Sequence, residues 1–292
     1  MATGSHLKES SQRGREFKGR DSGERSRSWL VMKYAIVSDI HSNLVAFKAV
    51  LRDIASRGGV DGVWCLGDTV GYGPDPNGCV DLLRNQNNLL CVAGNHDLGA
   101  VKKIVTSTFN FQAEAACKWN GDQLGKKQHE FLANLPTMVG NEGFTLVHGS
   151  PRDPVWEYVG MNNAWRNFNY FYGKVCLVGH SHVPEVWELL PNGEVRARLG
   201  QHGGTVKIGR NRLILNPGSV GQSRDGDKRA SYAIYNDETQ VVVFYRVKYD
   251  FKEARRREVR SGLRGVTAQY WPEWGEDSWL QENIWDQDEK CV

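Results

Sequence analysis

The sequence predicts an α/β protein in which two β-sheets pack face to face and helices lie outside them. Two observations support this fold class. Short apolar stretches alternate with helical stretches in the first part of the chain, whereas strand patterns dominate after Pro184. Polar residues that can bind metals also follow five of the apolar stretches. Open α/β sheets bind ligands at the carboxyl ends of their strands, so a site is expected there.

The alternating part contains five predicted strands, each short and apolar. They are residues 34–38, 63–66, 89–92, 144–148 and 175–179. A helix is predicted over 44–57, with Asn43 or Ser42 as its N-cap, and shorter helices near 79–85 and 162–172. Residues 98–135 have no strand pattern and are expected to form a helical cap insert of two or three helices.

The β-rich part contains six predicted strands. They are residues 185–190, 194–199, 205–208, 212–215, 231–236 and 240–247. Pro191-Asn192-Gly193 and Asn236-Asp237 indicate hairpin turns between them. Asp250 is expected to cap a charged helix over 251–261. The two parts together make one domain over residues 32–262.

The two ends differ in composition from this domain. Residues 1–31 are polar and without periodicity, and are expected to be a disordered leader or an added extension ahead of Met32. Residues 263–292 form a tail rich in tryptophan and acidic residues. Its indoles are expected either to cover the domain surface or to form a contact in a homodimer.

Charge and cysteine content narrow the class of protein. The net charge is +3, and residues 1–31 account for it with seven basic and four acidic residues, so no basic face for specific nucleic-acid binding is indicated. No stretch approaches the ~18 apolar residues of a membrane span. The six cysteines include no C-x-x-C pair and are interpreted as reduced, buried residues, which favours the cytoplasm.

The five polar blocks contain carboxylates, imidazoles and one amide, but no thiolate. They are Asp39-Ile40-His41, Gly67-Asp68, Gly94-Asn95-His96-Asp97, His148-Gly149 and Gly179-His180-Ser181-His182. Such oxygen and nitrogen ligands suit divalent manganese, iron, cobalt, nickel or zinc. Seven potential ligands are enough for two ions if Asp68 bridges them.

These blocks, together with the stretch GDTVGYGPDPN at residues 67–77, resemble the calcineurin-like metallophosphoesterase superfamily. Within it, the chain resembles the small stand-alone bacterial and archaeal branch with the motif GDxVGYGPDPN. The resemblance covers roughly residues 33–260 and implies a four-layer αββα sandwich. It also implies two metal ions, one held by Asp39, His41 and His182, the other by Asn95, His148 and His180, with Asp68 between them.

The resemblance further implies the chemistry of this centre. A hydroxide shared by the two ions would attack the phosphorus atom. His96 would donate a proton to the leaving group, and Asp97 would orient and charge the His96 ring. The alternative is that His96 and Asp97 only form the turn that starts a helix. Manganese is the expected metal, with iron, zinc, nickel or cobalt as alternatives.

The expected substrate is small and phosphorylated. Phosphoprotein phosphatases carry a phosphate-binding Arg after the Gly-Asp pair, whereas Thr69 stands here. Arg152 and Arg224 are candidates to replace it, and Tyr72 could either stack on an aromatic group or only wall the cleft. We therefore expect hydrolysis of a phosphodiester or phosphoanhydride. The alternatives are a phosphomonoesterase and a metal-free scaffold protein.

Overall fold

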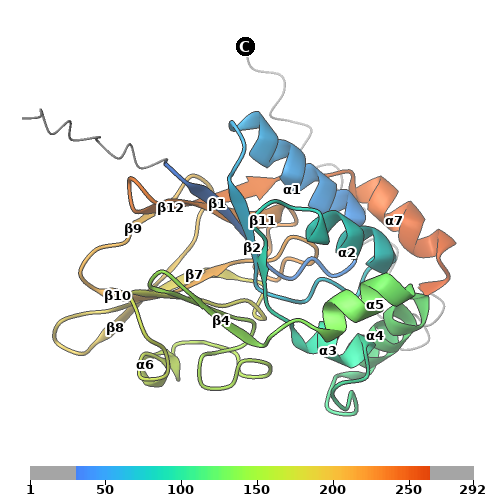
Figure 1. Ribbon diagram of the computed structural model, residues 1–292, viewed down its shortest axis with the longest axis horizontal. Coiled ribbons are helices and arrows are strands. Elements are labelled where there is room, and N and C mark those ends of the chain that lie inside the picture. The colour runs from blue at the N-terminus through green and yellow to red at the C-terminus, as the bar shows by residue number, and fades with distance from the viewer. Residues whose placement is uncertain (1–30, 264–292) are drawn as a thin grey trace, which may run out of the picture. The chain divides into compact units, whose positions relative to one another are not determined.

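Two six-stranded mixed sheets form the centre of the protein (Figure 1). The computed structural model describes residues 31–263. The expectations for the leader and for the tail therefore fall almost wholly outside the described residues. Within the described part, the fold is α/β with two packed mixed sheets and flanking helices, as predicted.

The first sheet has the strand order β3-β2-β1-β11-β12-β9. Its strands are β1 (Lys33–Val37), β2 (Gly62–Cys65), β3 (Leu90–Cys91), β9 (Thr205–Lys207), β11 (Ala230–Asn236) and β12 (Val241–Val247). β1, β2 and β3 are parallel, whereas β11 runs antiparallel to β1 and aligns Ile234 with Ala35. The parallel strands end at the same edge, where the first three polar blocks begin.

The second sheet has the strand order β4-β5-β6-β10-β7-β8. Its strands are β4 (Met138–Asn141), β5 (Phe144–Val147), β6 (Val175–Leu177), β7 (Pro184–Leu189), β8 (Val195–Leu199) and β10 (Arg212–Pro217). β5, β6 and β10 are parallel. The carboxyl ends of β5 and β6 bring the remaining two polar blocks to one edge of this sheet.

The main core lies between the two sheets. Ile36 and Trp64 of the first sheet are fully buried there with Leu146 and Leu215 of the second. Ala35, the residue before Ile36 in β1, points to the opposite face of the sheet and packs with the helices, because successive side chains of a strand alternate between the two faces. Burying each large apolar side chain contributes about 1.5–3 kcal/mol.

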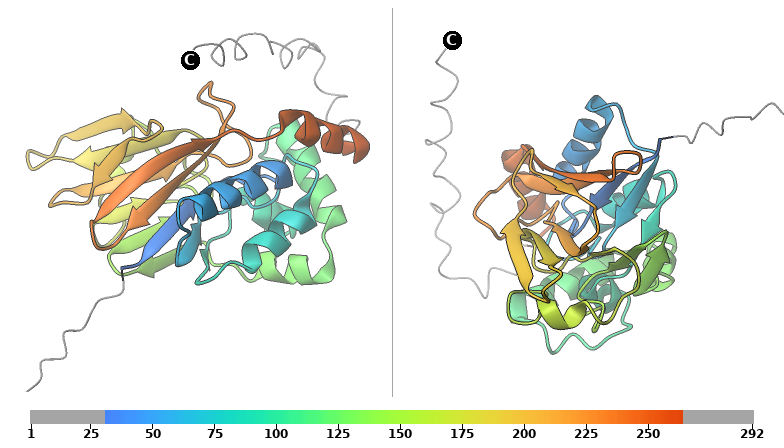
Figure 2. Two further views of the ribbon diagram at one scale, coloured as in Figure 1. Left: turned by 90° about the horizontal axis from the view of Figure 1, so that it is seen from above. Right: turned by 90° about the vertical axis from the view of Figure 1, so that its left-hand side faces the viewer.

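Most helices cover the outside of the first sheet and one end of the strands, whereas the short α6 packs against the second sheet. They are α1 (Leu44–Ser56), α2 (Pro76–Arg84), α3 (Asn95–Ala100), α4 (Phe111–Gln123), α5 (Lys126–Ala133), α6 (Ala164–Asn167) and α7 (Phe251–Arg260). Phe47 and Val50 of α1 pack against this sheet, and the Asn43 side chain caps α1 by accepting from the Ala46 N–H at 3.1 Å. Figures 1 and 2 show α3, α4 and α5 gathered at one end of the strands. None of the helices in the described residues is long and apolar enough to cross a membrane.

Two details of the outer layers differ from the sequence prediction. The helix expected near 162–172 is only the short α6. Beyond it, the Arg212 guanidinium donates to the carbonyls of Phe168 and Phe171, at 2.5 and 2.6 Å, so these carbonyls are taken by a side chain rather than by a continuing helix. The edge strand β4 was not predicted, because it is half exposed and contains Gly140.

Candidate metal centre

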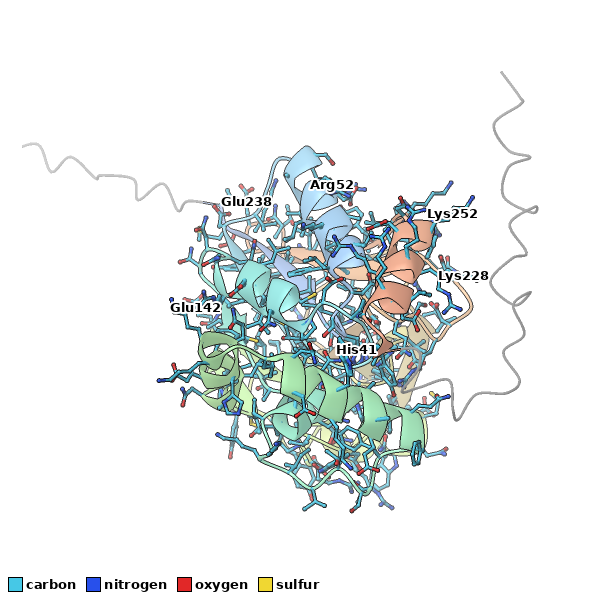
Figure 3. The ribbon with its side chains drawn as sticks, turned by 90° about the vertical axis from the view of Figure 1, so that its right-hand side faces the viewer. His41, Arg52, Glu142, Lys228, Glu238 and Lys252 are labelled. Atoms are coloured by element: carbon cyan, nitrogen blue, oxygen red, sulfur yellow. The ribbon has the colours of Figure 1, made fainter. Side chains whose placement is uncertain are left out.

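The five polar blocks meet where the strands of both sheets end. Asp39 and Asp68 follow β1 and β2, and the two loops are joined because the Asp39 N–H donates to the Gly67 carbonyl at 3.0 Å. His148 directly follows β5, and His180 lies three residues beyond β6. In the view of Figure 3, His41 lies between the helical segment 111–133 and helix α7.

The backbone at this place adopts a conformation that non-glycine residues rarely take. Ten non-glycine residues in the described part of the chain have a positive φ. Half of them are predicted metal ligands, namely Asp39, His41, Asp68, His180 and His182. A left-handed residue of this kind costs on the order of 1 kcal/mol or more, and clusters of such residues mark functional sites. The strands and loops around the centre therefore hold these side chains in place against local preference.

Two groups of buried ligand atoms lie side by side. Asp39, His41 and His182 form one group, and Asp68, His148 and His180 form the other, with the atoms of each group within 4.8 Å of one another. The Asn95 Oδ1 lies 3.0 Å from the His148 Nε2 and joins the second group. Asp68 also lies close to His41 of the first group, with Oδ2 3.7 Å from Nε2. The structure thus brings together all seven residues that the resemblance implied.

The histidines present lone pairs to one another. The Nδ1 atoms of His41 and His148 face the carbonyls of Val70 and Leu66 at 3.2 and 2.9 Å. A neutral ring that donates Nδ1–H to a carbonyl has its lone pair on Nε2. The Nε2 of His148 nevertheless faces the Asn95 Oδ1 and lies 3.1 Å from the His180 Nδ1. When all these rings are neutral, several acceptors converge with no donor between them, and this arrangement fits a bound cation.

The same geometry recurs in the other group. The Nδ1 of His182 lies 2.5 Å from the Gln222 carbonyl, and its Nε2 lies 3.0 Å from the Nε2 of His41. Asp39 accepts from the Ser38 hydroxyl and the His180 N–H through Oδ2, whereas its buried Oδ1 has no hydrogen-bond partner. That Oδ1 lies 3.2 Å from the His182 Nε2. The donor set therefore fits a divalent ion in this group as well.

Burial and the carboxylates set the charges of the imidazoles. Burial lowers the pKa of His180 to about 3 and that of His41 well below its usual range, so both rings are neutral. His148 is also buried, which disfavours its charge, but the Asp68 carboxylate at 3.3 Å raises its pKa to about 9. An ion bound there would replace the His148 proton, because a metal needs the neutral ring.

The expected partnership of His96 and Asp97 is not found. The Asp97 carboxylate accepts from the backbone N–H groups of Val70 and Gly94, both at 3.1 Å. The His96 Nδ1 is buried without a hydrogen-bond partner, and burial lowers the pKa of this ring to about 4. Asp97 thus braces the loops, and none of its hydrogen bonds goes to His96, so its predicted role in orienting and charging that ring stays a prediction. Asp97 lies in the first turn of α3, where backbone N–H groups are the nearest donors, and its carboxylate binds these instead of the His96 ring.

Two glycines allow the loops to approach this closely. A Cβ on Gly94 would collide with the Asp68 carboxylate. Gly71 has φ +136°, and a Cβ there would lie 2.5 Å from the His41 Nδ1. The Asn120 side chain of α4 secures the Gly71 loop by bonding to the carbonyls of Gly71 and Gly73. Sequence analysis missed Asn120, because nothing separates it from other polar helix residues.

The three predicted substrate-binding residues differ in their surroundings. Tyr72 packs against His41 and His96, with ring centroids 4.9 and 4.8 Å apart. The Arg224 guanidinium lies 5.9 Å from the centre of the Tyr72 ring and 3.5 Å from its hydroxyl. Arg152 is instead paired with Glu157, whose carboxylate also accepts from the Ser150 hydroxyl at 2.5 Å. Tyr72 and Arg224 therefore lie beside the centre, and Arg152 already has an anionic partner.

Further aromatic residues beside the centre were not predicted. Phe109 lies against His96 with ring centroids 4.9 Å apart, and Trp156 lies against Phe109 at 5.3 Å. Tyr158 stacks on His180 at 3.8 Å. These residues stand in segments without a motif, so no local sequence signal could have identified them.

Comparisons with known proteins agree on one family. Residues 32–240 match the calcineurin-like phosphoesterase superfamily domain. An uncharacterised protein of Methanocaldococcus jannaschii is 39% identical over 246 residues, which are 82% of this chain and 94% of that protein. A solved metallophosphoesterase from Sphaerobacter thermophilus is 39% identical, with a TM-score of 0.72 over 82% of this chain and 98% of that one. A hypothetical protein from Pyrococcus horikoshii has the same fold at 20% identity, with a TM-score of 0.65 over 81% of this chain and 96% of that one.

Proposed function

Because the chain belongs to the calcineurin-like phosphoesterase superfamily, we propose that it is a dinuclear metal-dependent hydrolase of small phosphodiesters or phosphoanhydrides. The observation that carries this proposal is the pair of buried ligand groups, with Asp68 of the second group 3.7 Å from His41 of the first. A carboxylate between two cations is the arrangement that holds them a few ångströms apart for attack on phosphorus.

In this proposal Asp39, His41 and His182 would hold one ion, Asn95, His148 and His180 would hold the other, and Asp68 would be shared between them. When bound, the two ions supply positive charge for the phosphoryl oxygens and a nucleophile derived from water. Manganese is the proposed metal, with iron, zinc, nickel or cobalt as alternatives that the same ligands accept.

The protein's own residues would handle the leaving group and the substrate. His96 lies beside the centre, between Tyr72 and Phe109, and is the proposed proton donor. Although burial keeps the free ring neutral, the negative charge of a bound phosphate would raise its pKa toward the range useful for an acid. Arg224 would contact the phosphoryl group or the remainder of the substrate from the far side of Tyr72.

Arg224 also favours a second candidate, phosphomonoester hydrolysis. A guanidinium near the centre could donate two parallel hydrogen bonds to a phosphate, and these bind a dianion more strongly than a monoanion. The metal-free scaffold alternative is disfavoured, because every ligand type is present and buried. Five described cysteines are free and buried, which supports the proposal of a reducing, cytoplasmic location.

The test compares bis-p-nitrophenyl phosphate with p-nitrophenyl phosphate, each with manganese, iron, zinc, nickel, cobalt or magnesium. We expect a higher kcat/KM for the diester with manganese, by about one decade, because no Arg follows Gly67-Asp68 to bind the dianion. Asp68→Asn should lose at least one ion by elemental analysis and nearly all turnover. A clear preference for the monoester would favour the second candidate, and an inactive, metal-free protein would favour the scaffold.

A further inference from the structure

Four aromatic side chains lie beside the candidate centre, three of them in contact with its histidines and Trp156 in contact with Phe109. We call them the aromatic rim: Tyr72, Phe109, Trp156 and Tyr158. Tyr72 and Phe109 contact His96, and Tyr158 lies on His180. All four remain at least partly exposed to solvent. They come from three separate segments of the chain, so the fold brings them to this place.

Tyr158 has the geometry of a stacking platform. Its ring lies nearly parallel to that of His180, with an interplanar angle of 19° and centroids 3.8 Å apart. The residue is 51% exposed, although one face of its ring is covered. A large apolar surface left open directly beside buried ligand residues is the kind of surface that a substrate covers.

We propose that the aromatic rim binds a planar aromatic group of the substrate, such as a nucleobase, on the open face of Tyr158 while the phosphorus lies at the metal centre. The inference rests on the proposed function and names the substrate class for the same site. Every nucleobase offers a π-face, so stacking tolerates base identity. Arg224, on the Tyr72 side, supplies a cation for the anionic part of the same molecule.

The test uses two diesters with the same leaving group and the same charge. One is the p-nitrophenyl ester of thymidine 5′-monophosphate, and the other is methyl p-nitrophenyl phosphate. Since stacking on an aromatic side chain changes affinity by about fivefold or more, kcat/KM should favour the thymidine ester by at least that factor. Tyr158→Ala should reduce the ratio to nearly one, whereas Tyr158→Phe, which keeps the ring, should preserve it.

Tyr172→Ala is the matched control, because Tyr172 is 96% exposed and lies outside the rim. This variant should keep the wild-type ratio. The two products provide a readout apart from turnover: calorimetry with manganese should show tighter binding of thymidine 5′-monophosphate than of methyl phosphate, and Tyr158→Ala should remove the difference.

The outcomes separate the rim from the proposed function. If the wild type hydrolyses both diesters equally and binds both products equally, the rim has no role in recognition and the phosphodiesterase proposal stands. If neither diester is hydrolysed with any metal, the proposed function fails. The product-binding measurement then still shows whether the aromatic rim binds the nucleobase. An unchanged ratio in Tyr158→Ala would overturn the assignment of Tyr158.

Discussion

At the scale of single residues, several buried atoms of the centre lack a hydrogen-bond partner in the protein. The Oδ1 of Asp39, the Nε2 of His180 and the Nδ1 of His96 are buried without hydrogen-bond partners. Leaving a buried polar group unsatisfied costs about 1–3 kcal/mol, so a folded protein retains such groups where a ligand completes them. For the Asp39 Oδ1 that ligand is proposed to be a metal ion, and for the His96 Nδ1 the substrate. The His180 ring faces the centre with its other nitrogen, Nδ1.

The first prediction tests His96 as the proton donor. His96→Asn should keep both metal ions and lose about 10²–10⁴ in kcat for an ester with a poor leaving group such as an alkoxide. The loss should be much smaller for p-nitrophenolate, which leaves without protonation. Steady-state kinetics on both esters, with metal content measured on the same samples, would check this. Equal losses on the two substrates would remove His96 from the acid role.

At the scale of elements, the loop between β10 and β11 reaches the centre and is held by a side chain of β12. The loop 218–229 carries Gln222, whose carbonyl orients His182, and Arg224 beside Tyr72. Arg246 of β12 is 8% exposed and binds the Asp225 carboxylate from the inside of this loop. Its guanidinium also lies 3.9 Å from Asp227. Arg246 is therefore a positioning residue for the loop.

The second prediction replaces Arg246 by Met. The Arg246 side chain is buried and that of Asp225 is partly open to solvent, so removing the guanidinium should lower the free energy of unfolding by about 1–3 kcal/mol. Affinity for one of the two ions should weaken roughly tenfold, because His182 loses its support (~1.4 kcal/mol). Urea denaturation and metal titration by calorimetry measure the two effects. Arg196→Met, which removes an exposed pair with Glu188, is the control and should change neither quantity by much. Similar behaviour of the two variants would contradict the role of Arg246.

At the scale of the whole domain, side chains distant in sequence tie the layers together. The buried Tyr232 of β11 donates to the Asp53 carboxylate of α1 at 2.6 Å, across 179 residues of sequence. Arg57 donates to the same carboxylate at 2.8 and 3.2 Å. Partial burial opposes the charge on Asp53, but these hydrogen bonds from Arg57 and Tyr232 lower its pKa below the usual value.

The third prediction follows from the lowered pKa of Asp53. Tyr232→Phe should lower the free energy of unfolding by about 1–1.5 kcal/mol at pH 7, because it removes a hydrogen bond to a charged acceptor while keeping the ring. An acid whose pKa is lowered by folding stabilises the protein above its unfolded pKa of about 3.9, and this contribution disappears as the pH falls through the folded pKa. The effect of the substitution should therefore shrink between pH 5 and pH 3.

The matched control is Tyr235→Phe, because the Tyr235 hydroxyl accepts from the neutral Gln240 amide at 2.7 Å. Its effect should stay constant over the same acid range, since neither partner titrates there. Urea denaturation at pH 7, 5 and 3 measures both variants. A Tyr232→Phe effect that is equally large at pH 3 would show that the hydroxyl acts through packing rather than through the Asp53 charge.

Local sequence determined the strands that lead to the centre and the residues that follow them. The apolar runs before Asp39, Asp68 and His148 predicted where strands end. This prediction needs only neighbouring residues, because a short apolar run followed by polar residues is typical of a buried strand. The resemblance then grouped the ligands into two sets, and the geometry is consistent with that grouping. The backbone of these loops also follows from local features, since Gly71 and Gly94 stand where no Cβ fits.

Only the tertiary structure decided which other side chains reach the centre. Arg152 and Arg224 were equivalent candidates by sequence, but Glu157 pairs with Arg152, while the loop held by Arg246 places Arg224 beside Tyr72. Tyr158 reaches His180 in the same way, through a turn that no motif marks. The physical reason is that a charged or aromatic side chain pairs with whichever group the packed structure places next to it. That partner is supplied by another part of the chain, so the choice is made only when the layers assemble.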